Sequence, residues 1–531
     1  MFADRQPAWM GIVRRELRTD HARWLRMARM TGCATFLATV FLVYRVPLPA
    51  YGAYVVLMAS QRDVATSITL SVGALVAATG AIALSVLLYM LDVDEPALRI
   101  PAMAVLMFGA MYLSRIPKLG PVLFLCGFLL VVTQTLVDQI PDTEALTHLL
   151  LWLLLLVACA CTLVPVVELI VGRRPALVFA DGLRERASRA APTISLRELA
   201  AMASRLGPPA LRRLSAAVQL EQVASLRAGT ADEVILEHAK RTLTEQLEDP
   251  GEEPGTPLSP APARPDRIAA VRFAFKATLA AMFCYVVYSG LDWPGLRTSI
   301  ITCFFVALGS TGETIHKLGL RLSGALIGGV LAGVSIVFLF PVMDDIGGFV
   351  VLFAAVTLLC TWVATSSPLL AYAGLQMAFA FYLGVLQDAG PTDDLTVLRD
   401  RLVGIVLGNV AMSLVFSTLW PVSTMASAKA ALARATGRQR RLLAADTPPA
   451  AIDVVGTAVD LEDASRLALL ASFDPGPSCR MPGQVDALLS SLRQVVTWSN
   501  VWLAAQPEDA EQRESLCKAL DTIDAEATDE R

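Results

Sequence analysis

The sequence Pro49-Ala50-Tyr51-Gly52 is followed by Ala59-Ser60-Gln61-Arg62-Asp63 and then by Gly73-Ala74-Leu75. A related series recurs about 250 residues later, as Pro294-Gly295, Gly309-Ser310-Thr311-Gly312-Glu313 and Gly324-Ala325-Leu326. Each copy lies within a set of six hydrophobic stretches. Many membrane carriers are built from such a duplicated unit, with charged residues where helices are interrupted. The repeat therefore predicts a carrier-like membrane protein.

The composition agrees with a protein that exposes apolar surface to lipid. Of the 531 residues, 55% are hydrophobic, and the mean hydropathy is +0.56. A soluble chain of this length has a lower apolar fraction, so the excess is expected to face the membrane. The net charge of −4 gives no reason to expect a nucleic-acid partner.

A membrane-spanning helix needs roughly 20 apolar residues. Six candidate spans lie in each half, and the second, fourth and eighth of them are short or interrupted. They are 30–46, 50–61, 64–90, 100–114, 119–138, 146–171, 268–289, 294–310, 318–340, 346–362, 368–387 and 397–420. Because six is an even number, the two halves have the same orientation. The sequence thus predicts an all-α polytopic protein with two parallel six-helix repeats.

The charges of the connections predict the orientation. Lys and Arg remain on the cytoplasmic side of membrane proteins. Twelve spans put the basic N-terminus, Arg62, Arg115 with Lys118, Arg173-Arg174 and the basic tail after residue 421 on one side. Acidic residues dominate the other side, where Arg45 and Arg399 are exceptions. We therefore expect both termini and the central segment to be cytoplasmic, and the basic N-terminus contains no pattern of a removed signal peptide.

Five segments follow from this layout. They are a basic cytoplasmic segment 1–29, a first repeat 30–171, a helical segment with a Pro-rich linker 172–267, a second repeat 268–421 and a helical C-terminal segment 422–531. Helical patterns are predicted at Leu196–Leu206, Ala231–Leu247, Ala426–Ala445, Val454–Ala471 and Val485–Ala505. The basic helix at Ala426 is expected to continue from the last span.

Residue types that bind metals or catalyse reactions are sparse. Seven of the nine cysteines lie in apolar stretches, where buried packing is their usual role. The four histidines lack metal-ligand spacing, so we expect no metal and no cofactor. No nucleophile–base pair or phosphate loop is present, which argues against an enzyme.

Two positions combine positive charge with the start of a span. Lys276 lies one turn after Arg272 in the seventh span, where it either attracts an anion or anchors the helix at the cytoplasmic edge. Trp293 and Pro294 open the eighth span, and Arg297 follows them. Exposed N–H groups at a helix start favour a carboxylate, although Trp293 alone is also typical of an interfacial anchor.

The segment from Gly309 to Lys317 is the main candidate site. Its two glycines and three hydroxyl residues predict an interrupted helix, in which Ser310 and Thr311 contact substrate. Glu313 is a candidate proton acceptor and His316 a candidate relay. The alternative is a cytoplasmic turn with a capping glutamate. Arg62 and Asp63 occupy the equivalent position in the first half.

Three further polar residues lie within the apolar spans of the second half. Arg321 begins a glycine-rich helix, and Gln376 and Asn409 lie deep in the eleventh and twelfth spans. All three are candidate substrate contacts, and hydrogen bonding between helices is the alternative. Arg401 beside Asp400 is interpreted as an edge anchor.

These motifs resemble the fusaric acid resistance family, within the aromatic acid exporter superfamily. The resemblance rests on Trp293-Pro294, the Gly-Ser-Thr-Gly break at 309–312, the run from Arg321 to Gly328, and Leu419-Trp420-Pro421 with the basic helix after it. It covers nearly the whole chain.

The resemblance implies a proton-driven efflux component of the bacterial inner membrane that exports aromatic carboxylic acids or similar organic anions. It also implies a periplasmic membrane-fusion adaptor and an outer-membrane channel as partners, besides the surrounding membrane lipids. Lys276, Arg297 and Arg321 would then attract the anion, and a homodimer is our expectation for the assembly. The alternatives are a passive anion channel and a membrane scaffold that acts through its cytoplasmic helices.

Overall fold

The structure is a computed structural model. It describes residues 21–92, 96–115, 120–138, 140, 142–187, 194–225, 233–248, 266–307, 309–343, 345–387, 390–391, 395–444, 450–475, 482–505 and 510–528. The predicted basic segment up to residue 20 and the Pro-rich linker 249–265 lie outside these residues, as do Lys118, Asp94, Glu95, Asp344, Asp388, Asp393 and Asp394.

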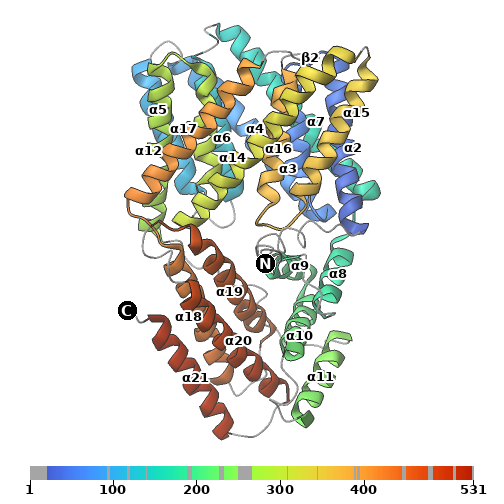
Figure 1. The fold of residues 1–531 in the computed structure, drawn as a ribbon, viewed down its shortest axis with the longest axis vertical. Coiled ribbons are helices and arrows are strands. Elements are labelled where there is room, and N and C mark those ends of the chain that lie inside the picture. Colours follow the sequence, from blue (N-terminus) through green and yellow to red (C-terminus); the bar gives the residue numbers. More distant parts are fainter. Residues whose placement is uncertain are drawn as a thin grey trace, which may run out of the picture. The chain divides into compact units, whose positions relative to one another are not determined.

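The chain divides into two compact units (Figure 1). Unit 1 comprises Met1–Arg173, Arg264–Leu308 and His316–Trp420. Unit 2 comprises Arg174–Ala263, Gly309–Ile315 and Pro421–Arg531. The short break at Gly309 therefore groups with the segments that flank the second repeat, which the sequence did not predict.

Unit 1 contains the apolar helices. The first half contributes α2 (His21–Val43), α3 (Pro49–Ala59), α4 (Val64–Asp92), α5 (Pro96–Leu113), α6 (Gly120–Leu136) and α7 (Thr143–Val171). The second half contributes α12 (Arg267–Gly290), η1 (Pro294–Arg297) with α13 (Thr298–Val306), α14 (Thr311–Val334) with η2 (Ser335–Leu339) and η3 (Phe340–Val342), α15 (Ile346–Ala364), α16 (Ala371–Val385) and α17 (Thr396–Thr418).

Within the described residues, seven of these helices are long and apolar enough to cross a membrane, and five shorter apolar helices accompany them. The prediction of an all-helical, polytopic membrane protein is confirmed. A two-residue pair, β1 (Leu386–Gln387) with β2 (Gly390–Pro391), is the single strand pairing in the described part of the chain. Its register joins Leu386 to Pro391.

Two helices begin earlier than hydropathy predicted. The helix α2 starts by His21, because its polar first turns do not raise the hydropathy although they are helical. The helix α14 starts at Thr311, so the predicted interruption shrinks to the residues just before Thr311, which include Gly309 and Ser310. Thr311, Gly312 and Glu313 form a first turn, where hydroxyl and acidic residues are favourable rather than disruptive.

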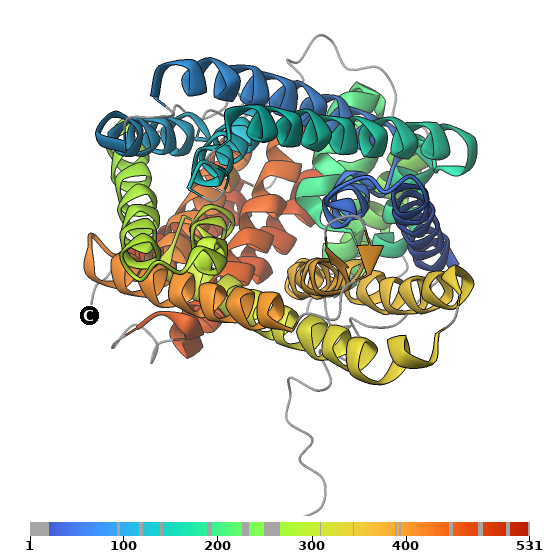
Figure 2. The same cartoon turned by 90° about the horizontal axis from the view of Figure 1, so that it is seen from above.

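The packing of unit 1 has the same pattern in both halves. In the first half α3 packs on α7, and in the second α13 packs on α17. Across the halves, α2 packs on α15 and α12 packs on α5, so the first helix of each half meets the fourth helix of the other. Seen from above, α4 and α7 run side by side along one edge of the unit, and α17 (orange) follows the opposite edge (Figure 2). This pairing supports the predicted repeat, which stays a prediction.

A close approach of two helices fixes the position of α14. The Cα atoms of Gly324 and Gly328 face α16, and a Cβ at either position would overlap the backbone carbonyl of Ala373 or Met377. Small residues spaced four apart permit this contact in membranes, where close packing replaces the hydrophobic drive. The predicted structural role of the glycine series is therefore visible in the geometry.

Unit 2 is helical as well. It contains α8 (Pro175–Ala187), α9 (Leu196–Leu206), α10 (Pro208–Ser225), α11 (Glu233–Glu248), α18 (Thr424–Ala444), α19 (Ala451–Leu470) with η4 (Ala471–Phe473), α20 (Pro482–Ala505) and α21 (Ala510–Thr528). Three apolar clusters of described residues hold it together. One joins α18, α19, α20 and α21, and another joins α8, α9 and α10 to α19. The third joins α10, α11 and α20.

The basic helix α18 does not continue from the last span, contrary to the prediction. Trp420 has a positive φ of 41° between α17 and α18, and Pro421 follows it. Proline removes a backbone donor, and the residue before it avoids the α conformation. The two helices are therefore separate elements.

Candidate functional site

The largest fully buried side chain among the described residues is that of Arg321, which is 1% exposed. It lies on α14, and all of its partners are neutral. Its Nε donates to Thr302 Oγ1 at 3.0 Å, and its Nη1 donates to Gln376 Oε1 at 2.8 Å and to the Tyr372 hydroxyl at 3.2 Å. A guanidinium is always charged in proteins, so unit 1 contains a buried positive charge held in place by hydrogen bonds.

A second arginine faces the same cavity. Arg401 on α17 lines it together with Arg321, Gln376 and the ring of Phe379. The Nε of Arg401 is buried and has no hydrogen-bond partner among the described residues. In the described part of the chain, neither arginine forms an ion pair with a carboxylate. The cavity measures about 20 Å³, which is enough for roughly one water molecule.

Aromatic residues of the first half complete this arrangement. The ring of Tyr54 on α3 lies 4.4 Å from that of Phe379, and the ring of Tyr51 lies 6.3 Å from it. Tyr51 also interacts with Arg401, and Tyr54 interacts with Gln376. Both halves of the chain thus contribute to one site, which we call the arginine cavity: Arg321, Arg401, Gln376, Phe379, Tyr51 and Tyr54.

Further positive charge lies around this cavity. One turn before Arg321, the ammonium of Lys317 lies 4.8 Å from the centre of the Tyr372 ring, a cation–π contact. Arg297 in η1 is close enough to Arg401 for the two charges to repel each other. The surroundings of the arginine cavity therefore carry an excess of positive charge, which favours an anionic guest.

Lys276, another predicted basic residue, binds a backbone carbonyl. Lys276 is 4% exposed. Its ammonium donates to the carbonyl of Trp420 at 3.2 Å and lies 4.7 Å from the centre of the Phe416 ring. It does not line the arginine cavity. Trp293 is half-buried, and the guanidinium of Arg399 lies 5.5 Å from its ring centre, so it too is engaged elsewhere.

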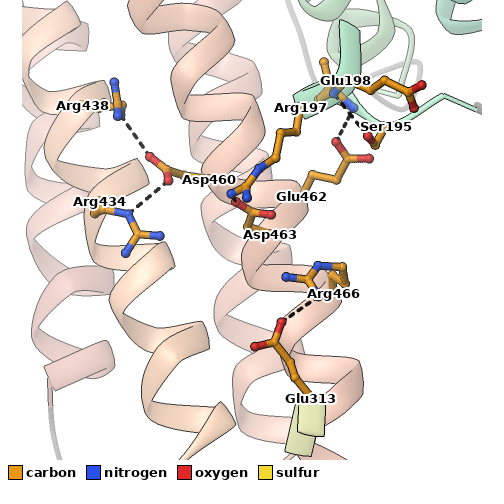
Figure 3. Close-up of polar contacts among 11 residues, drawn as sticks. Ser195, Arg197, Glu198, Glu313, Arg434, Arg438, Asp460, Glu462, Asp463 and Arg466 are labelled. Carbon is orange, nitrogen blue, oxygen red and sulfur yellow. Dashed lines mark hydrogen bonds and ion pairs between the residues drawn. The ribbon is translucent and has the colours of Figure 1, made fainter. Parts of the chain in front are cut away.

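Glu313 lies in unit 2 and pairs with a residue of α19. One carboxylate oxygen accepts from Arg466 Nη1 at 2.8 Å and the other from Ser310 Oγ at 2.9 Å (Figure 3). The Glu313 side chain is 15% exposed and that of Arg466 is 40% exposed. Thr311 donates its N–H to the carbonyl of Val422 at 3.0 Å. This geometry is that of a capped helix start with an ion pair.

The remaining predicted residues are also placed. His316 is half-buried and lies three residues after Glu313 on α14. Asp63 is 1% exposed and accepts from the N–H of Thr66 at 2.9 Å, so it caps α4, and Arg62 beside it is half-buried. Asn409 on α17 donates to the carbonyl of Leu318 at 3.3 Å, a bond between helices.

Of the predicted residues, Arg321 and Gln376 are brought together, whereas Lys276, Trp293 and Glu313 lie outside the arginine cavity. Sequence reasoning missed Arg401, Tyr51, Tyr54 and Phe379. A signal for Tyr51 was present, because it belongs to the repeated Pro49 motif. Arg401 was interpreted as an edge anchor because Asp400 precedes it, but Asp400 pairs with Arg399 at 2.8 Å.

Comparison with known proteins gives one group of relatives. The chain is similar to bacterial multidrug resistance proteins. It is 34% identical to multidrug resistance protein MdtO of Escherichia coli O6:H1 over 230 residues, which cover 42% of this chain and 33% of the relative. The MdtO of Escherichia coli K12 is 38% identical over 180 residues, covering 32% and 26%.

MdtO of Shigella flexneri is 35% identical over 198 residues, which cover 36% of this chain and 29% of the relative. The chain thus spans about a third or less of the length of these curated relatives. No protein-family model matches the chain, and no solved structure matches it.

Proposed function

We propose that this protein is an efflux transporter of the bacterial inner membrane that exports small organic anions, and that the arginine cavity binds the anionic group. The observation that carries the proposal is that Arg321 and Arg401 line one cavity without a carboxylate partner among the described residues. A charge inside a membrane protein is costly and usually marks a substrate or ion path. Similarity to multidrug resistance proteins supports export as the direction.

Aromatic carboxylic acids are the substrate class that we propose. Two guanidinium groups suit a carboxylate, which accepts paired hydrogen bonds in the plane of the fork. Phe379, Tyr51 and Tyr54 supply ring faces next to these donors. The resemblance to fusaric acid exporters points to the same class, with a periplasmic adaptor and an outer-membrane channel as proposed partners.

The closed cavity favours a carrier over a passive channel. Its volume of about 20 Å³ cannot hold an aromatic acid. A substrate can therefore enter only if α14, α16 and α17 move apart. A carrier changes conformation in each cycle, whereas an open channel needs a continuous path. We propose that the proton gradient drives this change. Glu313 and His316 are the candidates from the sequence for the proton path.

Transport by purified protein in liposomes tests the proposal. We expect a labelled aromatic carboxylate to exchange across the bilayer in the wild type, and Arg321→Gln to abolish exchange while the protein remains folded. Arg399→Gln is the matched control, because Arg399 is exposed and lies outside the cavity. Equal exchange by wild type and Arg321→Gln would refute the assignment. Anion current under an applied voltage, with no pH gradient, would identify a channel.

A further inference from the structure

A buried carboxylate lies at the first-half break, in a helix that the sequence presents as almost purely apolar. Glu168 is in the last turn of α7, and its side chain is 2% exposed. Its Oε1 accepts from Ser60 Oγ at 3.0 Å, directly after α3. Its Oε2 lies 3.4 Å from Arg29 Nη2 on α2, and no described residue donates a hydrogen bond to it.

Among the described residues, the charge that is paired with Glu168 comes from α2. The helices packed on α7 are α2, α3 and α4. From α2, Arg29 and the Cys33 thiol face the carboxylate. The connection before α4 contributes Ser60, whereas Asp63 there is turned to the N–H of Thr66. A carboxylate near a helix C-terminus meets the negative end of the dipole, so Arg29 is the group that offsets its charge.

The position in the second half that corresponds to Glu168 has no acidic residue. Arg29 Nη1 donates to the carbonyl of Val171 at 3.4 Å, and Lys276 Nζ donates to the carbonyl of Trp420 at 3.2 Å. In each half, a cation on the first helix thus binds a carbonyl at or just past the end of the sixth helix. Ser417 lies on α17 where Glu168 lies on α7, by the offset that relates Val171 to Trp420. The contact between the first and sixth helices therefore occurs in both halves, and in the second half it forms without an acidic residue at the position of Glu168.

We propose that Glu168 is the proton-binding group that couples export to the proton gradient. When Oε2 takes a proton, the ion pair with Arg29 is lost and Arg29 keeps the carbonyl of Val171, as Lys276 keeps that of Trp420. The tie between α2 and α7 weakens, and the break at Ser60 gains freedom. This inference rests on the proposed function. It replaces Glu313, whose carboxylate is paired with the partly exposed Arg466 of unit 2, as the coupling group.

Glu168→Gln tests the inference because the amide keeps the size and the acceptor for Ser60 but binds no proton. Glu144→Gln is the matched control on the same helix, where the side chain is 84% exposed. Exchange of labelled anion without a pH gradient is compared with uptake under an imposed gradient. We expect Glu168→Gln to exchange the anion but to lose the stimulation by the gradient, and Glu144→Gln to retain both. Gradient stimulation retained in Glu168→Gln and lost in Glu313→Gln would overturn the inference.

A second measurement does not depend on transport. Infrared difference spectra of the reconstituted protein, recorded during a pH titration, report the carbonyl stretch of a buried protonated carboxyl group. We expect a titrating band in the wild type and in Glu144→Gln that is absent in Glu168→Gln. Persistence of the band in Glu168→Gln would overturn the inference even if transport were never observed. Presence of the Glu168 band in a wild type that moves no anion would refute the proposed function alone.

Discussion

Arg321 on α14 donates to Gln376 on α16 at 2.8 Å, and this bond fixes a permanent positive charge inside unit 1. The same nitrogen, Nη1, also donates to the Tyr372 hydroxyl, and Nε donates to Thr302, so the guanidinium is oriented before any ligand arrives. Preorganised donors lose little free energy on binding. Arg401 across the cavity lacks a partner for its Nε, which makes it the side of the site that a carboxylate would satisfy.

Arg401→Gln is expected to weaken binding of an aromatic carboxylate by roughly 10- to 100-fold, because a hydrogen bond to a charged group contributes about 1.5–3 kcal/mol. Calorimetric titration of the detergent-purified protein measures the change. Arg399→Gln provides the control, since Arg399 pairs with Asp400 outside the cavity. Unchanged affinity in Arg401→Gln would remove Arg401 from the site.

Gly328→Ala is expected to destabilise unit 1 by about 1–3 kcal/mol, because the added Cβ overlaps the Met377 carbonyl and overpacking has that cost. The control is Gly319→Ala on the same helix, where nothing lies within 4 Å of the added Cβ. There the better helix propensity of alanine is expected to leave stability unchanged or slightly higher. Thermal unfolding in detergent compares the two variants. Equal melting temperatures would show that α14 and α16 are not tightly packed.

Asp474 has a demanding structural role in unit 2. Its carboxylate accepts from the Thr424 N–H at 2.7 Å and from the Thr424 hydroxyl at 2.6 Å, and that hydroxyl accepts from the Gly312 N–H at 2.9 Å. Asp474→Ala is expected to lower the free energy of unfolding by about 1–3 kcal/mol, because buried donors lose a charged acceptor. Chemical unfolding followed by circular dichroism measures this free energy. Asp181→Ala is the control, because the Asp181 side chain is partly exposed. An unchanged midpoint would contradict the role.

A pH dependence of unit 2 is expected from Glu462. Burial raises the pKa of this carboxyl above its ordinary value of 4.5, although Arg186 opposes the shift. The folded state therefore holds the proton more tightly than the unfolded state, and the free energy of unfolding falls as pH rises through the window between the two pKa values. Glu462→Gln is expected to reduce this slope, while the exposed Glu237→Gln keeps it. Unfolding midpoints measured across that pH window test this expectation. An equal pH dependence in wild type and Glu462→Gln would contradict it.

Much of the fold was predictable from the sequence. The candidate spans correspond to apolar helices because long apolar runs have few alternatives in a membrane protein. The predicted helix Leu196–Leu206 matches α9 in both bounds, since Ser195 caps its start and Gly207, with φ of 103°, ends it. The helices α8, α10 and α21 were missed. Each of them mixes charged with apolar residues, and its hydrophobic periodicity is weaker than that of α9.

The candidate site was only partly predictable. The individual residues Arg321 and Gln376 stood out as polar groups in apolar spans, but their contact depends on how α14 and α16 pack. Arg401 follows Asp400 in the sequence, but the Asp400 carboxylate forms its ion pair with Arg399. Glu168 is a single acid at the end of an apolar run, a pattern that is typical of an edge residue. Glu168 is buried by α2, α3 and α4. These helices lie far from it in the sequence, so its burial could not be predicted from the sequence.

The most direct test of the arginine cavity as an anion site is a comparison of two ligands that differ in charge. Equilibrium binding of a labelled aromatic carboxylate and of its neutral amide is measured on wild type and on Arg321→Gln. Because two arginines face the cavity, wild type is expected to bind the carboxylate at least tenfold more tightly than the amide, and Arg321→Gln is expected to lose this preference. Equal binding of the acid and the amide by wild type would contradict the arginine cavity as an anion site.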